Sequence, residues 1–285
     1  MELHDIPACG QAATRGVAHG ADPAQHGPVR TVVTTPLHPS SEDSAAAEAG
    51  AGRRGLALSP RGVRSLATVA RDAGADAVLV LGARHASLWA GGREHAWHAG
   101  MAELRLRRME RGEQATRDGF LEAAALRPGD AVLDATLGLG MDALVAAGAV
   151  GPAGRVLGVE ASLPLAALVA EGLARDPSPA ARRVEVVRDD SARVLHRLPD
   201  RSFDVVVFDP MFRQGRAANV AFDLVRRLGS PAPLASGTLA RARRVARRHV
   251  VVKDGVPGWD LARLGLAPLP CARWARRLYA RAAAL

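Results

Sequence analysis

A mostly apolar run that stops at an acidic residue constrains this 285-residue chain more than any other feature. The run begins at Phe203 and reads FDVVVF before Asp209 and Pro210. A run of this length is typical of a parallel strand that is covered on both faces. Because open α/β sheets bind ligands beyond the carboxyl ends of their strands, we expect Asp209, Pro210 and the following Phe212 at a functional site.

A second apolar strand, residues 131–136, leads into a turn that contains Gly138 and Gly140 and then into an apolar helix over residues 143–150. Two glycines permit a tight reversal from strand to helix and a close approach of the backbone to a ligand. The free amides at the start of the helix can donate hydrogen bonds to that ligand. This pattern predicts a turn that binds a nucleotide-type cofactor.

Two further strands are predicted, one at residues 155–160 and one from residue 184 onward. The first ends in Glu160, whose carboxylate is placed to accept two hydrogen bonds from a ribose diol. The second ends in polar residues that include Asp190 and Ser191, which are able to reach the edge of an adenine ring. Together with Asp209, these strand ends predict one continuous crevice along the rim of an α/β sheet.

Two nucleotide cofactors compete for this crevice. Residues 138–143 fit the loose dinucleotide pattern G-x-G-x-x-G/A, and Glu160 follows Gly140 by 20 residues, about the spacing found in NAD enzymes. Asp134 favours S-adenosylmethionine (SAM), because a carboxylate there would face the positively charged methionyl end and repel a pyrophosphate. Asp142 at the helix start favours SAM too, since it occupies the place that a bound anion would take. A plain turn followed by a first-turn acid is the simpler alternative.

Three segments follow one another along the chain: DATLGLGMD at residues 134–142, DPMF at 209–212 and VVVK at 250–253. They resemble motifs of the bacterial small-subunit ribosomal RNA (guanine-N2) methyltransferase family and of uncharacterised class I methyltransferases related to it. The resemblance runs from about Met101 to the C-terminus. It implies a Rossmann-like α/β sheet with helices on both faces, SAM as the cofactor, and ribosomal RNA or the small ribosomal subunit as the partner.

By position in these motifs, the resemblance implies cofactor contacts at Met141, Asp142, Glu160, Ala161, Asp190, Ser191 and Asp209. The reasoning from the residues themselves adds Asp134, Gly138 and Gly140.

The chemistry expected at the rim is methylation of a planar amine. A methyl group on a sulfonium is already activated, so the enzyme chiefly has to orient the nucleophile and exclude water. Hydrogen bonds from an exocyclic base amine to the Asp209 carboxylate and the Pro210 carbonyl would disperse the charge that develops, and Phe212 could stack on the ring. Our hypothesis is that Asp209 also accepts the proton. Phe212 could instead pack under a loop, and Pro210 could simply end the strand.

A net charge of +9 suits an acidic partner such as nucleic acid. The chain contains a single lysine, Lys253, and this bias toward arginine can equally reflect a GC-rich coding sequence. Arg213 and Arg216 are expected to border the substrate, because their loop follows the predicted pocket. Lys253 is expected either to face a substrate phosphate or to be an exposed structural lysine. A further arginine cluster at residues 241–248 predicts a basic helix.

Breaks in the pattern divide the chain into a disordered tail (1–30), a small α/β unit with a bridging helix (31–114) and the methyltransferase domain (115–285). The small unit is expected to contain strands at 30–34 and 77–81, a helix at 60–73 and a hairpin at 87–97. Trp89 and Trp97 are expected to pack in its core rather than to stack on bases. Residues 273–280 are expected to form a closing antiparallel strand.

The two cysteines and the absence of a membrane or secretory segment lead us to expect a cytoplasmic, metal-free protein. Cys9 and Cys271 give neither a metal-ligand spacing nor a disulfide framework, and no apolar stretch of membrane-spanning length or secretory signal is present. Three alternatives to ribosomal RNA methylation stay open. They are methyl transfer to another planar amine (in DNA, tRNA or protein), an NAD-linked oxidoreductase, and a non-catalytic RNA-binding factor.

Overall fold

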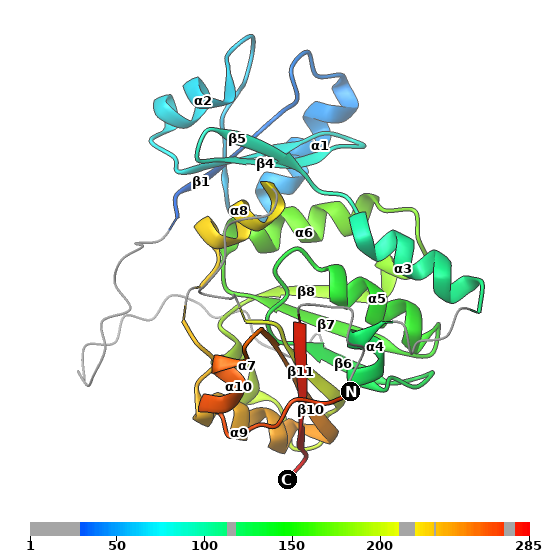
Figure 1. Cartoon of the computed structure of the whole chain (residues 1–285). Coiled ribbons are helices and arrows are strands. Elements are labelled where there is room, and N and C mark those ends of the chain that lie inside the picture. The colour runs from blue at the N-terminus through cyan, green and yellow to red at the C-terminus, as the bar shows by residue number, and fades with distance from the viewer. Residues whose placement is uncertain (1–28, 113–117, 211–219, 231, 271–276) are drawn as a thin grey trace.

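The structure of the protein is a computed structural model that describes residues 29–112, 118–210, 220–230, 232–270 and 277–285. It contains a five-stranded and a six-stranded sheet, with helix α3 (Gly100–Glu110) between them in the chain (Figure 1). The predicted tail lies almost entirely outside the described residues. No helix in the described ranges is both long enough and apolar enough to cross a bilayer.

The six-stranded sheet has the order β11-β10-β9-β6-β7-β8. Its strands are β6 (Ala131–Asp134), β7 (Arg155–Glu160), β8 (Val184–Arg188), β9 (Phe203–Phe208), β10 (Ala246–Gly255) and β11 (Arg277–Ala283). Neighbouring strands pair in parallel, except for the antiparallel pair of β10 and β11. The predicted parallel strands and the closing antiparallel strand are therefore present, and the α/β fold class is confirmed.

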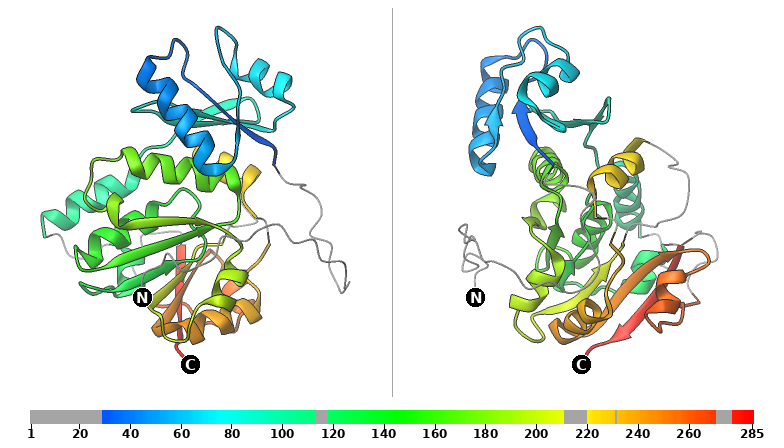
Figure 2. Two further views of the ribbon diagram at one scale, coloured as in Figure 1. Left: turned by 180° about the vertical axis from the view of Figure 1, so that it is seen from behind. Right: turned by 90° about the vertical axis from the view of Figure 1, so that its left-hand side faces the viewer.

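Helices cover both faces of this sheet (Figure 2). One layer is formed by α3, α4 (Gly119–Ala124), α5 (Met141–Val150) and α6 (Leu163–Arg175), and the other by α7 (Ser191–Arg197), α9 (Ser236–Val245) and α10 (Trp259–Arg263). Val205 and Val207 of β9 join the core under the first layer, whereas Val206 and Phe208 join the core under the second. Strand β9 is thus buried on both faces, as its apolar run predicts.

The five-stranded sheet has the order β2-β1-β3-β4-β5. Its strands are β1 (Thr31–Thr34), β2 (Ala57–Leu58), β3 (Ala77–Leu81), β4 (Ala86–Ala90) and β5 (Arg93–Ala96), which confirms the expected strands and hairpin. Helix α2 (Leu66–Ala73) is shorter than predicted, because the Ser65 side chain caps it by accepting the N–H of Thr68. Helix α1 (Ser41–Arg54) was not predicted, since its Ala- and Gly-rich sequence lacks a clear apolar stripe; a capping box of Ser40 and Asp43 begins it.

Helix α6 joins the two sheets, and α8 (Val220–Leu228) lies beside it (Figure 1). Leu165 and Leu168 of α6 share a core with strands β3 and β4. The Glu171 side chain is only 2% exposed and pairs with Arg53 at 2.8 Å and Arg54 at 2.5 Å, both from α1. The N-terminal unit is therefore packed against the helical layer of the larger sheet.

Two tryptophans of the N-terminal unit were expected to pack rather than to stack on bases. Trp89 and Trp97 do pack against buried clusters, and the Trp97 indole N–H donates to the carbonyl of Leu139 at 3.1 Å.

The predicted basic helix at residues 241–248 is wrong in its second half. Arg247 and Arg248 lie in β10, because α9 ends at Val245 and the strand starts at the buried Ala246.

Gly172 in α6 provides a test of this packing. A Cβ atom at this position would lie 2.2 Å from Cδ2 of Trp97, and a side chain there forces the ring away. Ala is normally favoured over Gly inside a helix by about 1 kcal/mol. We expect Gly172→Ala to have the opposite sign and to lower the free energy of unfolding by about 1–3 kcal/mol in urea denaturation.

Gly52→Ala is the matched control, because a Cβ at Gly52 in α1 would meet no atom within 4 Å. This variant should be neutral or stabilising. Equal shifts for the two variants would contradict the close contact between Trp97 and α6.

Candidate active site at the carboxyl ends of the strands

The strand register places three predicted site residues on one face of the larger sheet. Asp134 pairs with Val207, and Val252 pairs with Phe208, so Lys253 lies next to Asp209. The side chains that precede them on the same face, such as Val207, belong to the core under α5. Asp134, Asp209 and Lys253 therefore converge at the rim near the start of α5.

A chain of ion pairs connects these residues. The Lys253 Nζ atom lies 2.6 Å from Oδ2 of Asp209 and 2.9 Å from Oδ2 of Asp142. Arg105 of α3 lies 2.7 Å from the other oxygen of Asp142 and 2.6 Å from Asp118, the residue that caps α4. The side chains of Asp142 and Lys253 are 13% and 14% exposed, whereas that of Asp209 is 30% exposed. Asp209 is thus the most accessible of these three.

The carboxyl groups of this cluster differ in pKa, because their burial and their charged neighbours differ. Burial raises the pKa of Asp142, but Lys253 and Arg105 outweigh it and hold the pKa at about 2. Desolvation raises the pKa of Asp209, and Lys253 offsets this only in part. Burial, together with the nearby charges of Asp142 and Asp209, raises the pKa of Asp134 to about 7. Lys253 stays protonated, because Asp142 and Asp209 raise its pKa despite burial.

Among the described residues, this cluster contains more carboxyl groups than cationic groups. The carboxyl groups are those of Asp118, Asp134, Asp142 and Asp209, and the cations that act on them are Arg105, Lys253 and Arg277. Such an excess suits a ligand end that carries positive charge, as the ammonium and sulfonium of SAM do, and disfavours a pyrophosphate. The charged residues of this cluster therefore fit the methionyl end of SAM. Within the described ranges, no group of His, Cys, Asp and Glu side chains is arranged to hold a metal ion.

The glycine turn lies beside this cluster. Gly138 and Gly140 have φ values of 53° and 78°, a left-handed conformation that favours glycine, and Gly140 is the cap of α5. Glu160 at the end of β7 accepts the N–H of Gly138 at 3.0 Å and that of Ser162 at 2.8 Å. A Cβ atom on Gly138 would have only the Thr136 carbonyl oxygen within 4 Å, so the turn is open above this residue. The predicted turn can therefore be approached closely by a ligand.

The other predicted cofactor residues follow the neighbouring strands. Met141 begins α5 and is half-buried, and Ala161 is exposed directly after Glu160. Asp190 caps α7 by accepting the N–H of Arg193, and Ser191 is the first residue of that helix. These residues extend the same rim toward β8, as expected for the adenosine end of the ligand.

Lys253 differs from both of its sequence-based expectations. It is neither an exposed structural lysine nor available to a phosphate, because its ammonium group is buried between Asp142 and Asp209. The cause is the register of β10 with β9, which the sequence does not reveal. Pro210 is buried after β9, whereas Phe212, Arg213 and Arg216 lie outside the described residues.

Sequence reasoning missed the roles of four residues at this site. The sequence pattern assigned no role to Arg105, Asp118 or Tyr279. Burial raises the pKa of Tyr279, near Lys253, to about 12. Ser162 has a buried hydroxyl oxygen with no hydrogen-bond partner in the described structure.

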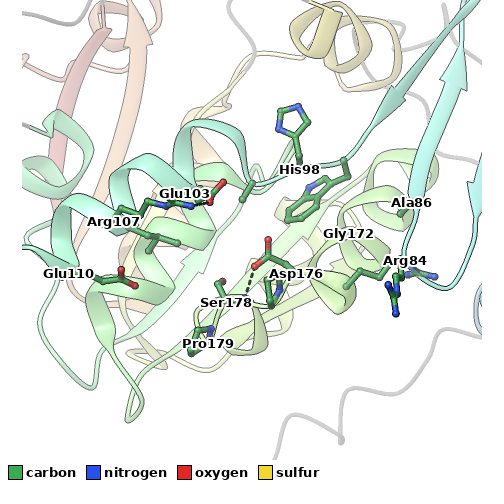
Figure 3. A pocket seen from close by; sticks show the side chains of 15 residues that line it. Arg84, Ala86, His98, Glu103, Arg107, Glu110, Gly172, Asp176, Ser178 and Pro179 are labelled. Atoms are coloured by element: carbon green, nitrogen blue, oxygen red, sulfur yellow. Dashed lines mark hydrogen bonds and ion pairs between the residues drawn. The ribbon is translucent and has the colours of Figure 1, made fainter.

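A separate cavity of about 540 Å³ lies between α3 and the C-terminal end of α6 (Figure 3). It is lined by residues that include Trp97, His98, Arg107, Glu110 and Asp176. Because α6 returns from the end of β7 toward the start of β8, this cavity lies away from the rim that carries the predicted site. None of the predicted site residues that the structure describes lines it.

Comparisons with known proteins identify relatives of this chain. Residues 74–261 match the family described as "Putative SAM-dependent methyltransferase". The uncharacterised protein YpiP of Bacillus subtilis (strain 168) is 33% identical over 169 residues, which are 57% of this chain and 65% of that protein. The match thus spans less than two thirds of the length of YpiP. A SAM-dependent methyltransferase from Neisseria gonorrhoeae has the same fold, with a TM-score of 0.57 and 18% identity over 88% of this chain and 95% of that chain.

The family match answers the question of the cofactor. The cofactor is SAM, and the interpretation as an NAD-linked oxidoreductase is set aside. The residues at the rim fit this cofactor for the electrostatic reason given above.

Asp134 makes SAM binding depend on pH if it faces the methionyl end. A cationic ligand favours the ionised carboxylate, and the pKa of about 7 means that this form is lost as the pH falls below neutrality. If only the ionised form binds, we expect affinity about tenfold weaker near pH 6 than near pH 8, with proton release on binding at pH 7. Calorimetry in two buffers of different ionisation enthalpy measures both quantities. Asp134→Asn should bind weakly at either pH, and equal wild-type affinities would exclude this role.

Proposed function

The chain belongs to the family described as "Putative SAM-dependent methyltransferase", and from this premise we propose that it methylates the exocyclic N2 amine of a guanine in ribosomal RNA. The observation that carries the proposal is the position of Asp209. It follows a doubly buried strand, lies on the same face as Asp134 and Lys253, and is the most accessible member of the Asp142–Lys253–Asp209 group.

Asp209 binds and orients the amine that receives the methyl group. When bound, SAM supplies a methyl group that is activated by the sulfonium. The lone pair of an exocyclic base amine is delocalised into the ring, so the nitrogen needs acceptors that favour a more tetrahedral geometry. The Asp209 carboxylate and the Pro210 carbonyl are the acceptors at this point of the rim. The nitrogen takes the methyl group as the S–C bond of SAM breaks, with the electron pair of that bond left on the sulfur as a neutral thioether, and the nitrogen gives up one proton, which Asp209 accepts directly or through water.

Lys253 positions the Asp209 carboxylate. It holds Oδ2 of Asp209 at 2.6 Å, and the oxygen assigned to the substrate amine in this proposal is Oδ1. Its charge also limits the rise in the pKa of Asp209, so that this carboxyl group stays available as a proton acceptor. Asp142, which is itself fixed by Arg105, in turn holds Lys253 in place. The accepting oxygen thus has little freedom, which is what orientation of a weak nucleophile requires.

The choice of ribosomal RNA is supported by charge and by motif resemblance. The net charge of +9 suits a polyanionic substrate. The DPMF segment at residues 209–212 resembles that of the guanine-N2 methyltransferases of the small ribosomal subunit. A planar ring with an exocyclic amine also fits an acceptor site built from a carboxylate and a carbonyl.

The direct test is methyl transfer from tritiated SAM to small-subunit ribosomal RNA, supplied both naked and as assembled particles. The RNA is then digested and the labelled nucleoside is identified by mass spectrometry. We expect N2-methylguanosine, formed by the wild-type protein and not by Asp209→Asn. If the label appears in another nucleoside, in tRNA, in DNA or in protein, that molecule is the substrate and the proposal of guanine N2 in ribosomal RNA is wrong. Absence of transfer to any of them, with SAM still bound, would indicate a non-catalytic RNA-binding factor.

A further inference from the structure

The segment that follows β10 exposes two large apolar side chains at the end of the sheet that carries the candidate active site. Val256 is 66% exposed and Trp259 is 68% exposed. Trp259 is the only aromatic side chain among the exposed large apolar residues in the described part of the chain. An exposed tryptophan is costly to leave in water, and clusters of exposed apolar side chains mark interaction sites.

The backbone that carries these side chains is firmly anchored. Asp254 is 5% exposed, and its carboxylate accepts the N–H groups of Gly255, Asp260 and Leu261. Leu261 is 1% exposed and belongs to the core under α10. Trp259 is therefore held outward by a fixed turn.

Gly258 shows how tightly this turn is packed. Its φ is 91°, and a Cβ atom at this position would lie 2.8 Å from Cδ1 of Leu278 in β11. Its N–H donates to the Gly255 carbonyl at 2.6 Å. The turn thus closes directly over the end of β10.

The position of this turn relates it to the site. Lys253 and Asp254 are neighbours on β10 and leave the strand on opposite faces, Lys253 toward Asp209 and Asp254 toward α10. Because Asp254 binds the first turn of α10, Trp259 lies just beyond the same strand end that supplies Lys253. The Val256–Trp259 surface therefore lies at the same end of the sheet as Asp209, in the segment that follows Lys253.

We propose that Trp259, supported by Val256, is a stacking platform for an unpaired base of the substrate RNA next to the methylated nucleotide. This rests on the proposed function, because it presupposes an RNA whose target base is presented from a loop or an unstacked strand. Aromatic side chains bind such bases face to face, with little dependence on the base identity. The protein, with its charge of +9, supplies the attraction for the phosphates.

The test compares Trp259→Ala and Trp259→Phe with the wild-type protein. Trp259→Ala should raise the KM for RNA and the dissociation constant for an unmethylated RNA fragment by about ten- to a hundredfold, as expected for loss of one stacked base. The affinity for SAM should not change, and Trp259→Phe should keep most of the RNA affinity. Val63→Ala is the control, because Val63 is 87% exposed on the N-terminal unit, away from the rim.

The outcomes separate the platform from the proposed function. If Trp259→Ala methylates and binds RNA like the wild type, the platform is overturned and the methyltransferase assignment to RNA stands. If the wild-type protein neither binds nor methylates RNA, the stacking platform and the proposed function are both wrong. If Trp259→Ala changes only the oligomeric state in light scattering, the surface contacts a second copy of the chain, which also overturns the platform.

Discussion

Replacement of Asp209 by asparagine should slow methyl transfer by about 10²–10⁴-fold, the range expected when a positioned proton acceptor is lost. Asparagine keeps an oxygen that can accept a hydrogen bond from the amine, so binding of the acceptor is expected to suffer less than turnover. Lys253 retains Asp142 as a partner, which limits the effect on the fold. Single-turnover kinetics on RNA, with the SAM affinity measured by calorimetry, separate chemistry from cofactor binding.

The pH dependence of the wild-type rate gives the same prediction a second readout. Because desolvation raises the pKa of Asp209, its carboxyl group takes up a proton at a higher pH than usual and then cannot accept one from the amine. At saturating SAM, where the effect of Asp134 on cofactor affinity is removed, the rate should therefore fall as the pH is lowered, and Asp209→Asn should lack this limb of the pH profile. Asp200→Asn is a suitable control, because that side chain is 70% exposed and pairs with Arg244 outside the site. Turnover of Asp209→Asn near the wild-type value would rule out an essential role of this charge.

Replacement of Lys253 by methionine should have the largest effect on stability. Lys253 is the partner of two carboxylates, and removal of one member of a buried ion pair costs about 3–5 kcal/mol. Arg105 continues to neutralise Asp142, so the unpaired charge is left mainly on Asp209. We expect the loss in urea or thermal unfolding at about pH 8, accompanied by reduced methyl transfer.

The sign of the pH dependence distinguishes this cause from loss of packing. Without Lys253, the pKa of Asp209 in the folded state rises further above its value in the unfolded chain. A carboxyl group with a raised folded pKa loses stability as the pH rises from the unfolded value, about 3.9, through the folded value. The deficit of Lys253→Met should therefore be small near pH 5 and largest above neutrality. Lys253→Arg keeps the charge and should show much less of it, whereas a deficit independent of pH would contradict the ion-pair explanation.

Several elements of this protein can be predicted because their signals are local. The apolar run before Asp209 predicts a doubly buried strand, and Val205 to Phe208 do alternate between two cores. Gly138 and Gly140 predict a tight turn, and both have positive φ. By contrast, α1 escaped prediction because its Ala- and Gly-rich residues give no amphipathic pattern, and its stability comes from capping and from contacts of Arg53 and Arg54 with Glu171 in α6.

The sequence by itself determined where β6, β7 and β9 end in or just before an acidic residue, because hydrophobic period and chain breaks are properties of neighbouring residues. It thereby located Asp134, Glu160 and Asp209 at one rim. Only the tertiary structure decided that Lys253 lies between Asp142 and Asp209, and that Trp259 stands exposed at the same end of the sheet. Those relations depend on the register of β10 against β9 and on the packing of α5 and α10, and interactions between distant segments leave no spacing rule in the chain.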